Sequence, residues 1–315
     1  MTIGVDLGGT KMLVGVLDGT EVLWEDREAS TGQEEGALVE MLVRQVDAAR
    51  AAHPEVAAIG LGIPATIDHE RGVAVSAVNL PIDNLPIREI VSERTGLPTF
   101  VDNDANVAAF AEYVYGAARG KTETVMLTIG TGIGGGLILG GEVYRGASGA
   151  GAELGHTVID INGPPCQGNC PGRGCIETMA SGTAIGREGR EAAAREPGSA
   201  LGRLLAEGKQ VDGQAVTEAA QAGDSVALGV LELVGTRLGA ALTTFANTFE
   251  PEVIILGGGA MAAGELLLGP ARRELRARAL RPMNETPVLP AEMGSDAGMI
   301  GAAAMARAEM GREGD

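Results

Sequence analysis

The N-terminal segment alternates short apolar runs with glycine-containing turns. The runs predict three β-strands, Thr2–Leu7, Met12–Leu17 and Glu21–Arg27. Their connections are too short for a helical crossover, so we expect an antiparallel meander. A helical spacing of apolar residues follows over Gly36–Ala52, and an apolar run ending before a proline predicts a buried strand over Ala57–Ile63.

Helices and strands alternate along the rest of the chain, which is typical of an α/β fold. The predicted helices are Pro86–Gly96, Val107–Gly116, Thr183–Glu196, Ser225–Phe249 and Asp296–Glu309. The predicted strands are Thr99–Val101, Val125–Ile129 and Val253–Leu256. A chain of 315 residues exceeds the usual size of one hydrophobic core, so we expect two domains. Charge and glycine cluster at Ala117–Lys121, where we place the boundary.

An internal repeat links the two halves of the chain. Asp6–Gly19 aligns without gaps on Thr128–Gly141, and Gly8 then lies opposite Gly130. Each copy consists of a strand, a glycine-rich turn and a second strand. Two related domains that each offer a hairpin loop to one ligand would produce this pattern. Chance similarity between two glycine-rich hairpins is the alternative for so short a match.

Composition and charge narrow the classes of function. The chain carries 24 Lys and Arg residues against 42 Asp and Glu residues, a formal net charge of −18. Surfaces that bind nucleic-acid phosphates or anionic membranes have the opposite balance. The N-terminus lacks a basic segment followed by a long apolar run, and the apolar strands are too short to cross a bilayer. We therefore expect a cytoplasmic protein that binds neither nucleic acid nor a membrane.

Three glycine-rich turns each follow a short apolar strand. They are Gly8-Gly9-Thr10, Gly130-Thr131-Gly132 and Gly257-Gly258-Gly259. Backbone N–H groups in such turns can approach phosphate oxygens closely. The pattern of a P-loop is absent, and a hairpin stands where a dinucleotide site would have a strand leading into a helix. One such turn alone is more often structural, but three together, two of them related by the repeat, predict a nucleotide phosphate site.

Two charged residues beside the first turn fit the same interpretation. Lys11 follows the turn directly, and Asp6 precedes it. A carboxylate in this position could hold Mg²⁺ through water, because magnesium prefers carboxylate oxygens and retains several waters.

Asp104 lies in the polar run Asp102–Asn106, between a predicted strand and a predicted helix. A carboxylate there could accept the proton of a substrate hydroxyl that attacks a γ-phosphoryl group. Asn103 and Asn106 are neutral neighbours suited to binding hydroxyls. The alternative is a helix N-cap, a role that the sequence favours more for Asn106 than for Asp104.

All three cysteines lie close together in the chain, ten to nineteen residues after a histidine. The four residues are His156, Cys166, Cys170 and Cys175. They match a closed, tetrahedral, structural zinc site, and four protein ligands leave no open position for catalysis. Proline and glycine surround the cysteines, so metal binding would supply the order of this segment. Glu153 and Glu177 flank it and could accept hydrogen bonds from a polyol, or could be solvated surface charges.

These motifs together resemble those of the ROK family of sugar kinases and transcriptional repressors. The resemblance is carried by Asp6–Lys11, Asp102–Asn106, Gly130–Gly134, Glu153–His156, Gly174–Glu177 and Leu256–Gly259. It implies an α/β fold of the actin-like, ribonuclease-H-like ATPase class, with two domains around a nucleotide- and sugar-binding cleft. The implied N-terminal domain is 1–118, joined by a C-terminal helix at 297–315. The implied larger domain is 119–296, with a zinc loop at 156–177.

The resemblance also implies a role for each candidate residue. Asp104 is implied as the base for the sugar 6-hydroxyl. The implied sugar contacts are Asn79, Asn103, Asp104, Glu153, His156 and Glu177. The implied ATP and Mg²⁺ contacts are Asp6, Gly8, Gly9, Thr10, Lys11, Gly130, Thr131, Gly132, Gly258 and Gly259. His156 would bind Zn²⁺ through one ring nitrogen and face the sugar with the other.

Two features depart from the family pattern. The usual cysteine run has one residue between the first two cysteines, whereas here three separate Cys166 from Cys170. An aromatic residue often found shortly after the Asn79-type asparagine is also missing.

The resemblance implies ATP-dependent phosphorylation of a hexose at its 6-hydroxyl, with glucose favoured. An N-acetylhexosamine kinase or a fructokinase of the same family would look much the same in sequence. Polyphosphate is an alternative phosphoryl donor, although the family members that use it generally lack the cysteine cluster. An inactive sugar-binding sensor is the alternative outside enzymes. The repressors carry a DNA-binding segment before the core, so the five residues before Asp6 favour a kinase. A homodimer or homotetramer is a family-level expectation.

Overall fold

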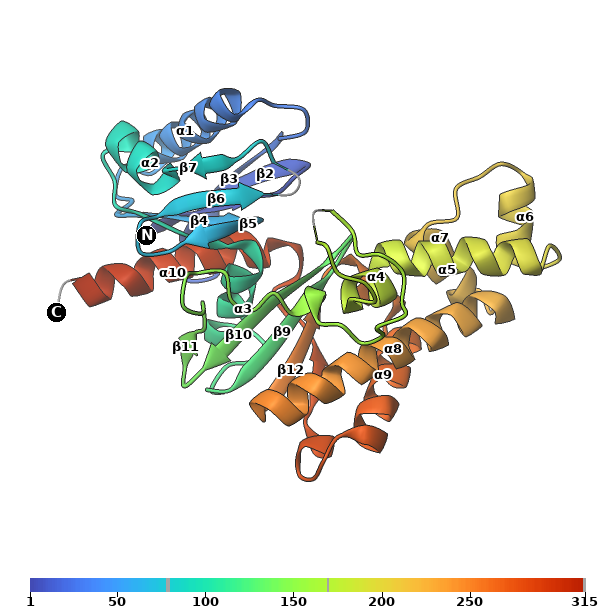
Figure 1. Ribbon diagram of the computed structural model, residues 1–315. Helices are drawn as coiled ribbons and strands as arrows, with labels where there is room; N and C mark the ends of the chain where they lie inside the picture. Colours follow the sequence, from blue (N-terminus) through green and yellow to red (C-terminus); the bar gives the residue numbers. More distant parts are fainter. Residues whose placement is uncertain (78–79, 169, 314–315) are drawn as a thin grey trace. The chain divides into compact units, whose positions relative to one another are not determined.

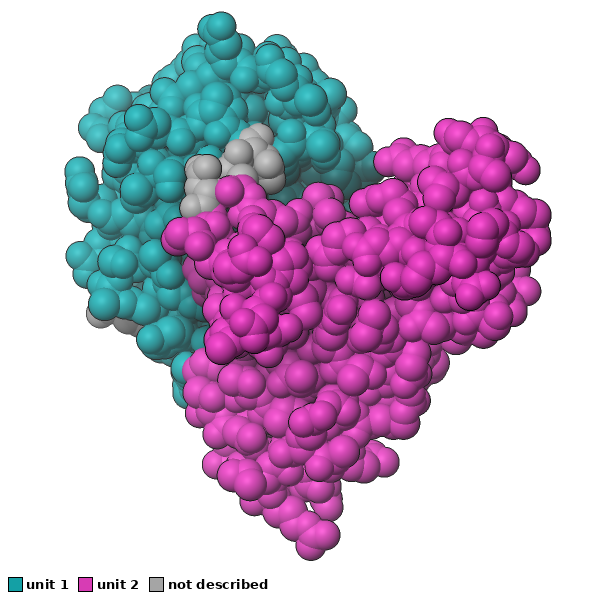
Figure 2. Space-filling model, turned by 45° about the vertical axis from the view of Figure 1, so that its right-hand side comes forward, with its two compact units in different colours: residues 1–122, 136–152, 291–315 teal, residues 123–135, 153–290 magenta. Residues whose placement is uncertain are grey.

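The computed structural model describes residues 1–77, 80–168 and 170–313 as a mixed α/β protein (Figure 1). Its chain divides into two compact units, coloured separately in Figure 2. Unit 1 comprises Met1–Thr122, Gly136–Ala152 and Ala291–Asp315, and unit 2 comprises Glu123–Gly135 and Glu153–Pro290. The domain limits inferred at 118 and 296 stay a prediction, because a compact unit of the structure need not be a domain that folds independently.

The first sheet has the strand order β3-β2-β1-β4-β8. Strands β1 (Thr2–Leu7), β2 (Lys11–Asp18) and β3 (Glu21–Ala29) are antiparallel neighbours, which confirms the predicted meander. Strands β4 (Ile59–Ile63) and β8 (Thr99–Asn103) continue the sheet in parallel from β1. The parallel strands therefore end at the same edge as β1, where the first glycine turn begins.

The second sheet repeats this order as β11-β10-β9-β12-β13. Its strands are β9 (Thr124–Ile129), β10 (Ile133–Leu139), β11 (Glu142–Val143), β12 (Val253–Gly257) and β13 (Val288–Pro290). Strand β12 is parallel to both β9 and β13, as β4 is to β1 and β8. The two aligned sequence segments thus occupy equivalent hairpins, and this shared topology supports the repeat over chance similarity.

A small sheet of three strands, β5-β6-β7, was not predicted. Its strands are β5 (Ala65–Asp68), β6 (Val73–Ala77) and β7 (Asp83–Leu85). These strands are short and mix apolar with polar residues, so their sequence carries little periodic signal. Helices α1 (Glu35–Ala52) and α2 (Ile87–Thr95) begin and end within one residue of their predicted bounds.

The last helix, α10 (Ala297–Glu313), packs on the first sheet of unit 1. A Cβ added to Gly4 on β1 would lie 2.0 Å from the Met299 carbonyl oxygen, and one on Gly60 of β4 would lie 1.9 Å from that of Ala302. The bare glycine backbones therefore let the helix approach the strands closely. The hydroxyl of Thr2 donates a hydrogen bond to the Ala303 carbonyl at 3.0 Å.

Helices dominate the rest of unit 2. They are α4 (Ile176–Ala180), α5 (Gly182–Arg195), α6 (Ala200–Ala206), α7 (Gly213–Gln221), α8 (Ser225–Phe249) and α9 (Glu265–Arg278). By length and composition alone α8 could span a membrane. It packs against α9, α7 and α5, however, and buries Leu231, Leu238 and Leu242. We therefore interpret α8 as a core helix.

Candidate active site and metal centre

The first glycine turn, between β1 and β2, is held by its own backbone and by Ser30. The Gly8 N–H donates to the Lys11 carbonyl at 2.8 Å. The Ser30 hydroxyl donates to the Gly8 carbonyl at 2.6 Å, and the Ser30 N–H donates to the Thr10 carbonyl at 3.1 Å. Because these bonds use carbonyl groups of the turn, its shape is fixed before any ligand is present.

Asp6 lies near the end of β1, where α10 begins. A Cβ on Gly298 would lie 2.7 Å from the Asp6 carboxyl carbon, so this side chain is packed against the first turn of the helix. Burial raises the pKa of Asp6, the Lys11 ammonium opposes that effect, and the nearby Asp296 carboxylate adds to it. The carboxylate is thus held where a cation would stabilise its charged form.

Asn103 and Asp104 lie where β8 passes into α3 (Asp104–Val114). The Asn103 side-chain oxygen accepts from the N–H groups of Ala105 (2.9 Å) and Asn106 (3.3 Å), which makes Asn103 the N-cap. The helix was predicted to begin at Val107, and this was wrong. Asn103 caps it three residues earlier because its oxygen reaches two otherwise unpaired N–H groups.

A buried ion pair lies under this turn. Asp102 is 2% exposed, and its carboxylate accepts from the Asn103 N–H (2.8 Å), the Asn106 side-chain amide (2.8 Å) and Arg145 Nε (2.6 Å). The Asn106 amide is therefore engaged inside the protein, and the idea that it binds hydroxyls finds no support here. Sequence reasoning missed Arg145, since nothing local marks a partner that lies 43 residues along the chain.

The second glycine turn, between β9 and β10, is held by residues that follow the cysteine segment. The Gly182 N–H donates to the Gly130 carbonyl, and the Thr183 hydroxyl donates to the Thr131 carbonyl, both at 2.8 Å. The Ile133 N–H donates to Glu177 Oε2 at 2.9 Å. Three separate contacts from the start of α4 and α5 thus fix this turn.

The third turn joins β12 to a short 3₁₀ helix, Gly259–Ala263. Gly258 has a φ of 88°, in the region that favours glycine, and a Cβ there would lie 2.5 Å from the Ile129 carbonyl oxygen. The turn therefore packs tightly against the end of β9, immediately before the second turn. Within unit 2, two of the predicted phosphate and adenosine loops lie side by side.

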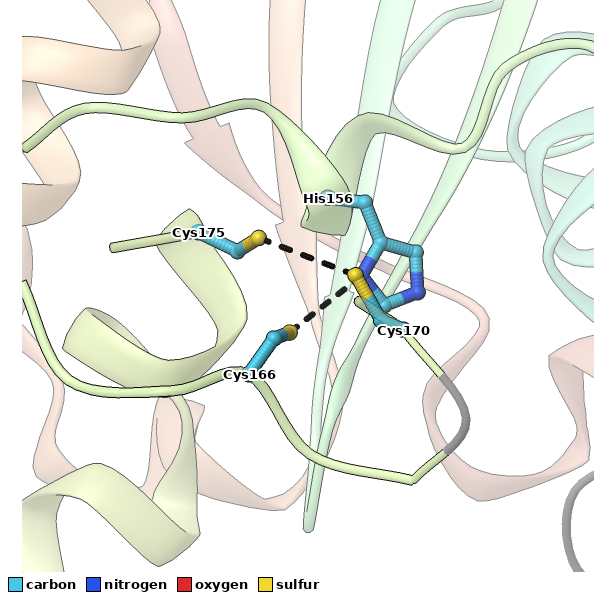
Figure 3. A group of neighbouring side chains, drawn as sticks. All are labelled: His156, Cys166, Cys170 and Cys175. Carbon is cyan, nitrogen blue, oxygen red and sulfur yellow. Dashed lines mark hydrogen bonds between the residues drawn. The ribbon is translucent and has the colours of Figure 1, made fainter. Parts of the chain in front are cut away.

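The four predicted metal ligands converge on one point (Figure 3). The ligand atoms of His156, Cys166, Cys170 and Cys175 all lie within 4.8 Å of one another. His156 Nδ1 is 3.5 Å from Cys166 Sγ, and the sulfurs of Cys170 and Cys175 are 4.0 Å apart. Tetrahedral zinc bonded to sulfur and nitrogen would place ligand atoms about 3.5–3.8 Å apart, so this set fits the ion.

The chemistry of the donor set also fits a divalent cation. Burial and the neighbouring Cys175 and Cys170 thiols raise the pKa of Cys166 to about 12. Thiolates in such a group need a compensating positive charge, which zinc supplies on binding. The Gly172 N–H, 3.4 Å from Cys170 Sγ, adds a hydrogen bond of the kind that surrounds metal-bound sulfur.

His156 presents its second nitrogen to Glu153. Its Nε2 is 4.0 Å from Glu153 Oε2, while Nδ1 faces the thiols. Partial desolvation raises the pKa of Glu153, His156 opposes this, and the Glu177 carboxylate adds to it. Glu153, His156 and Glu177, the three predicted sugar contacts of unit 2, are therefore close enough to interact electrostatically.

A sequence model for the ROK family matches residues 2–309. The chain belongs to the ROK family. The match covers nearly the whole chain, which confirms the family identified from the motifs.

Relatives with reported functions are similar to this ROK protein over its length. A glucokinase from Thermotoga maritima is 36% identical, with 98% of each chain covered. A xylose repressor from Bacillus spizizenii is 30% identical, with 95% of this chain and 75% of that protein covered. The crystal structure of a ROK family glucokinase from Streptomyces griseus, in complex with glucose and AMPPNP, matches with 36% identity and a TM-score of 0.85 over 98% of this chain and 99% of that one. The predicted actin-like α/β class is confirmed by this likeness.

The candidate residues of this ROK protein are divided between the two units. Unit 1 holds Asp6, Gly8, Gly9, Thr10, Lys11, Asn103 and Asp104. Unit 2 holds Gly130, Thr131, Gly132, Glu153, His156, Glu177, Gly258, Gly259 and the cysteines. Asn79 lies outside the described residues. The roles assigned to these residues stay predictions, and Glu177 has an additional contact that the motif did not reveal.

Proposed function

We propose that this ROK protein is a hexokinase-type phosphotransferase that transfers the γ-phosphoryl group of ATP to the 6-hydroxyl of a hexose, with glucose favoured. The observation that carries the proposal is the full-length likeness to a glucokinase whose structure holds glucose and AMPPNP. The glucokinase from Thermotoga maritima, matched over 98% of each chain, supports the same activity. The presence of Asp104 and of both repeated glycine turns favours an active enzyme over a sugar-binding sensor.

In the proposed reaction, the sugar O6 forms a bond to the γ-phosphorus while the bond from that phosphorus to the β,γ-bridging oxygen breaks. The O6 proton passes to the Asp104 carboxylate, and ADP leaves. Asn103, as the cap of α3, holds the backbone of Asp104 in place. The Gly8–Lys11 and Gly130–Gly132 turns would position the triphosphate through backbone N–H groups, and Lys11 would add a positive charge.

Two metal ions complete the proposal. Mg²⁺, when bound, would neutralise charge on the β- and γ-phosphates, with Asp6 holding it through water. Zn²⁺ would be structural, held by His156 Nδ1 and the three cysteines. With Nδ1 bound to zinc, His156 keeps its proton on Nε2 and becomes a fixed hydrogen-bond donor toward Glu153 and a sugar hydroxyl.

A coupled ADP-release assay with Mg-ATP tests the activity. The panel would be glucose, mannose, fructose, N-acetylglucosamine, N-acetylmannosamine and allose, with zinc content measured on the same preparation. We expect turnover with glucose and about one zinc per chain. Turnover confined to another sugar would keep the mechanism and change the substrate, and turnover with polyphosphate alone would change the donor.

The Asp104→Ala variant tests the proposed base. We expect kcat to fall by about 10²–10⁴-fold, the usual contribution of a positioned general base, while glucose binding measured by calorimetry stays near that of the wild type. Asp47→Ala, at an exposed position on α1, is the matched control and should keep full activity. A near-normal rate for Asp104→Ala would remove Asp104 from the mechanism. Inactivity of the wild type with preserved glucose binding would favour the sensor.

A cytoplasmic location and a homodimeric or homotetrameric state accompany the proposal as predictions. Light scattering of the purified protein tests the second.

A further inference from the structure

The Gly130–Gly132 turn is fixed by a segment that begins two residues after the last zinc ligand. Glu177, Gly182 and Thr183 each bond to this turn or to the residue after it. The turn's own Gly130 N–H bonds to the Gly132 carbonyl at 2.9 Å, which closes it without outside help. The contacts from 177–183 therefore set where the closed turn lies.

Of these three residues, Glu177 is the one that makes its contact through a carboxylate. Its Oε2 accepts from the Ile133 N–H at 2.9 Å, although the two residues are 44 positions apart in the chain. A Cβ on Gly132 would lie 2.2 Å from the same oxygen, so glycine is needed for the carboxylate to reach this site. The bond is charge-assisted, a kind about twice as strong as one between neutral groups.

The position of Glu177 depends in turn on the cysteine segment. Cys175 is the N-cap residue of α4, and Glu177 lies in the first turn of that short helix. The Ile176 N–H donates to the Thr157 carbonyl at 2.9 Å, next to His156. The Thr178 hydroxyl donates to the Pro165 carbonyl at 3.3 Å, next to Cys166. A metal that joins His156, Cys166 and Cys175 would thus fix the residues on both sides of Glu177, Ile176 and Thr178.

We propose that Glu177 is a positioning residue that couples the metal centre to the Gly130–Gly132 turn, so that zinc raises the affinity of the protein for nucleotide. The proposal rests on the proposed function in one respect, the role of this turn in binding ATP phosphates. It adds a second role for Glu177 beside the predicted contact with sugar. Zinc then acts on both substrates, through His156 on the sugar side and through Glu177 on the phosphate side.

The test measures binding of Mg-AMPPNP by calorimetry without sugar, so that it does not depend on turnover. Zinc-loaded and chelator-treated wild type are compared with Glu177→Ala and Glu177→Gln. Glutamine keeps an acceptor oxygen at the same length, whereas alanine removes it. Glu191→Ala, at an exposed position on α5, is the matched control.

We expect zinc removal to raise the Kd for AMPPNP about tenfold in the wild type, the effect of losing one hydrogen bond to a charged group. Zinc-loaded Glu177→Ala should show the same rise, with little further change when zinc is removed. Glu177→Gln should bind within a few-fold of the wild type. Hydrogen exchange of the peptide containing Ile133 should accelerate in Glu177→Ala and in the zinc-free wild type.

Two outcomes would overturn the coupling. One is an unchanged AMPPNP affinity in zinc-loaded Glu177→Ala, a comparison that stays valid if the zinc-free protein unfolds. The other is a zinc response of full size in that variant. Failure of the zinc-loaded wild type to bind AMPPNP at all would instead overturn the proposed function, so the two failures can be told apart.

Discussion

Asp6 carries its carboxylate where the surrounding protein disfavours a negative charge. Burial and the nearby Asp296 raise its pKa above the ordinary value of 3.8, against the opposing charge of Lys11. Between the pKa of Asp6 in the unfolded chain and its higher pKa in the folded protein, the folded protein holds a proton that the unfolded chain has released. The stability of the ligand-free protein therefore falls as the pH rises through this range. Such a cost is typical of a residue kept for binding a cation rather than for folding.

The Asp6→Asn variant should separate these two effects. Without Mg²⁺ and nucleotide, we expect a melting temperature about 2–4 °C above that of the wild type at pH 7, and a gain that shrinks toward pH 4. Phosphorylation activity should fall strongly, because the proposed magnesium contact is lost. Differential scanning fluorimetry over this pH range provides the measurement, with Asp47→Asn as the exposed control. A lower melting temperature for Asp6→Asn at pH 7 would contradict the interpretation.

At the scale of elements, the turn from β8 to α3 depends on the Asp102–Arg145 pair. Asp102 holds both the backbone of Asn103 and the side chain of Asn106, and Arg145 balances its buried charge. The sulfur of Met305 and the carboxylate of Glu309 on α10 lie 3.7 Å and 4.0 Å from the same guanidinium. Three separate chain segments thus fix the turn that carries Asp104.

Arg145→Met leaves the Asp102 carboxylate buried without its partner. We expect a loss of about 3–5 kcal/mol in stability, and a kcat lowered by more than KM because Asp104 is displaced. In the double variant with Asp102→Asn, the unpaired charge is gone and part of both losses should be recovered. Thermal unfolding and initial rates measure these effects.

The exposed Arg94–Glu40 pair provides the control, since Arg94→Met should cost no more than about 1 kcal/mol. An Arg145→Met protein with wild-type kcat would show that the pair stabilises the fold without positioning Asp104.

At the scale of the whole molecule, the C-terminal helix α10 completes the hydrophobic core of unit 1, which the N-terminal strands begin. Helix α10 buries Met299, Ala302 and Met305 against the first sheet and α3. A Cβ on Gly301 would lie 1.8 Å from the Val107 carbonyl oxygen, and one on Gly60 would lie 1.9 Å from that of Ala302. Unit 1 therefore needs α10 to reach its full packing.

Gly301→Ala and Gly60→Ala should each destabilise the protein by about 1–3 kcal/mol or more, because the added methyl group meets backbone that cannot move aside easily. Gly36→Ala, at an exposed position on α1 with nothing within 4 Å of the new methyl group, should be neutral or stabilise by up to about 1 kcal/mol. Thermal unfolding of the three variants provides the comparison. Equal melting temperatures for all three would show that α10 adapts its position.

The sequence by itself determined the local elements, the repeat and the family. Strand Thr2–Leu7 and helix Ser225–Phe249 have their predicted limits, because apolar periodicity and caps act over a few residues. The spacing of the cysteines after His156 predicted, in the same way, four side chains whose ligand atoms the fold brings within 4.8 Å of one another.

Only the tertiary structure decided how these elements hold the site. Helix α9 was missed because Pro270 interrupts its pattern, yet close packing against α8 supports it. The Glu177–Ile133 bond and the Asp102–Arg145 pair join residues more than forty positions apart. Which N–H a carboxylate accepts from depends on how distant segments pack, and no local pattern encodes that choice.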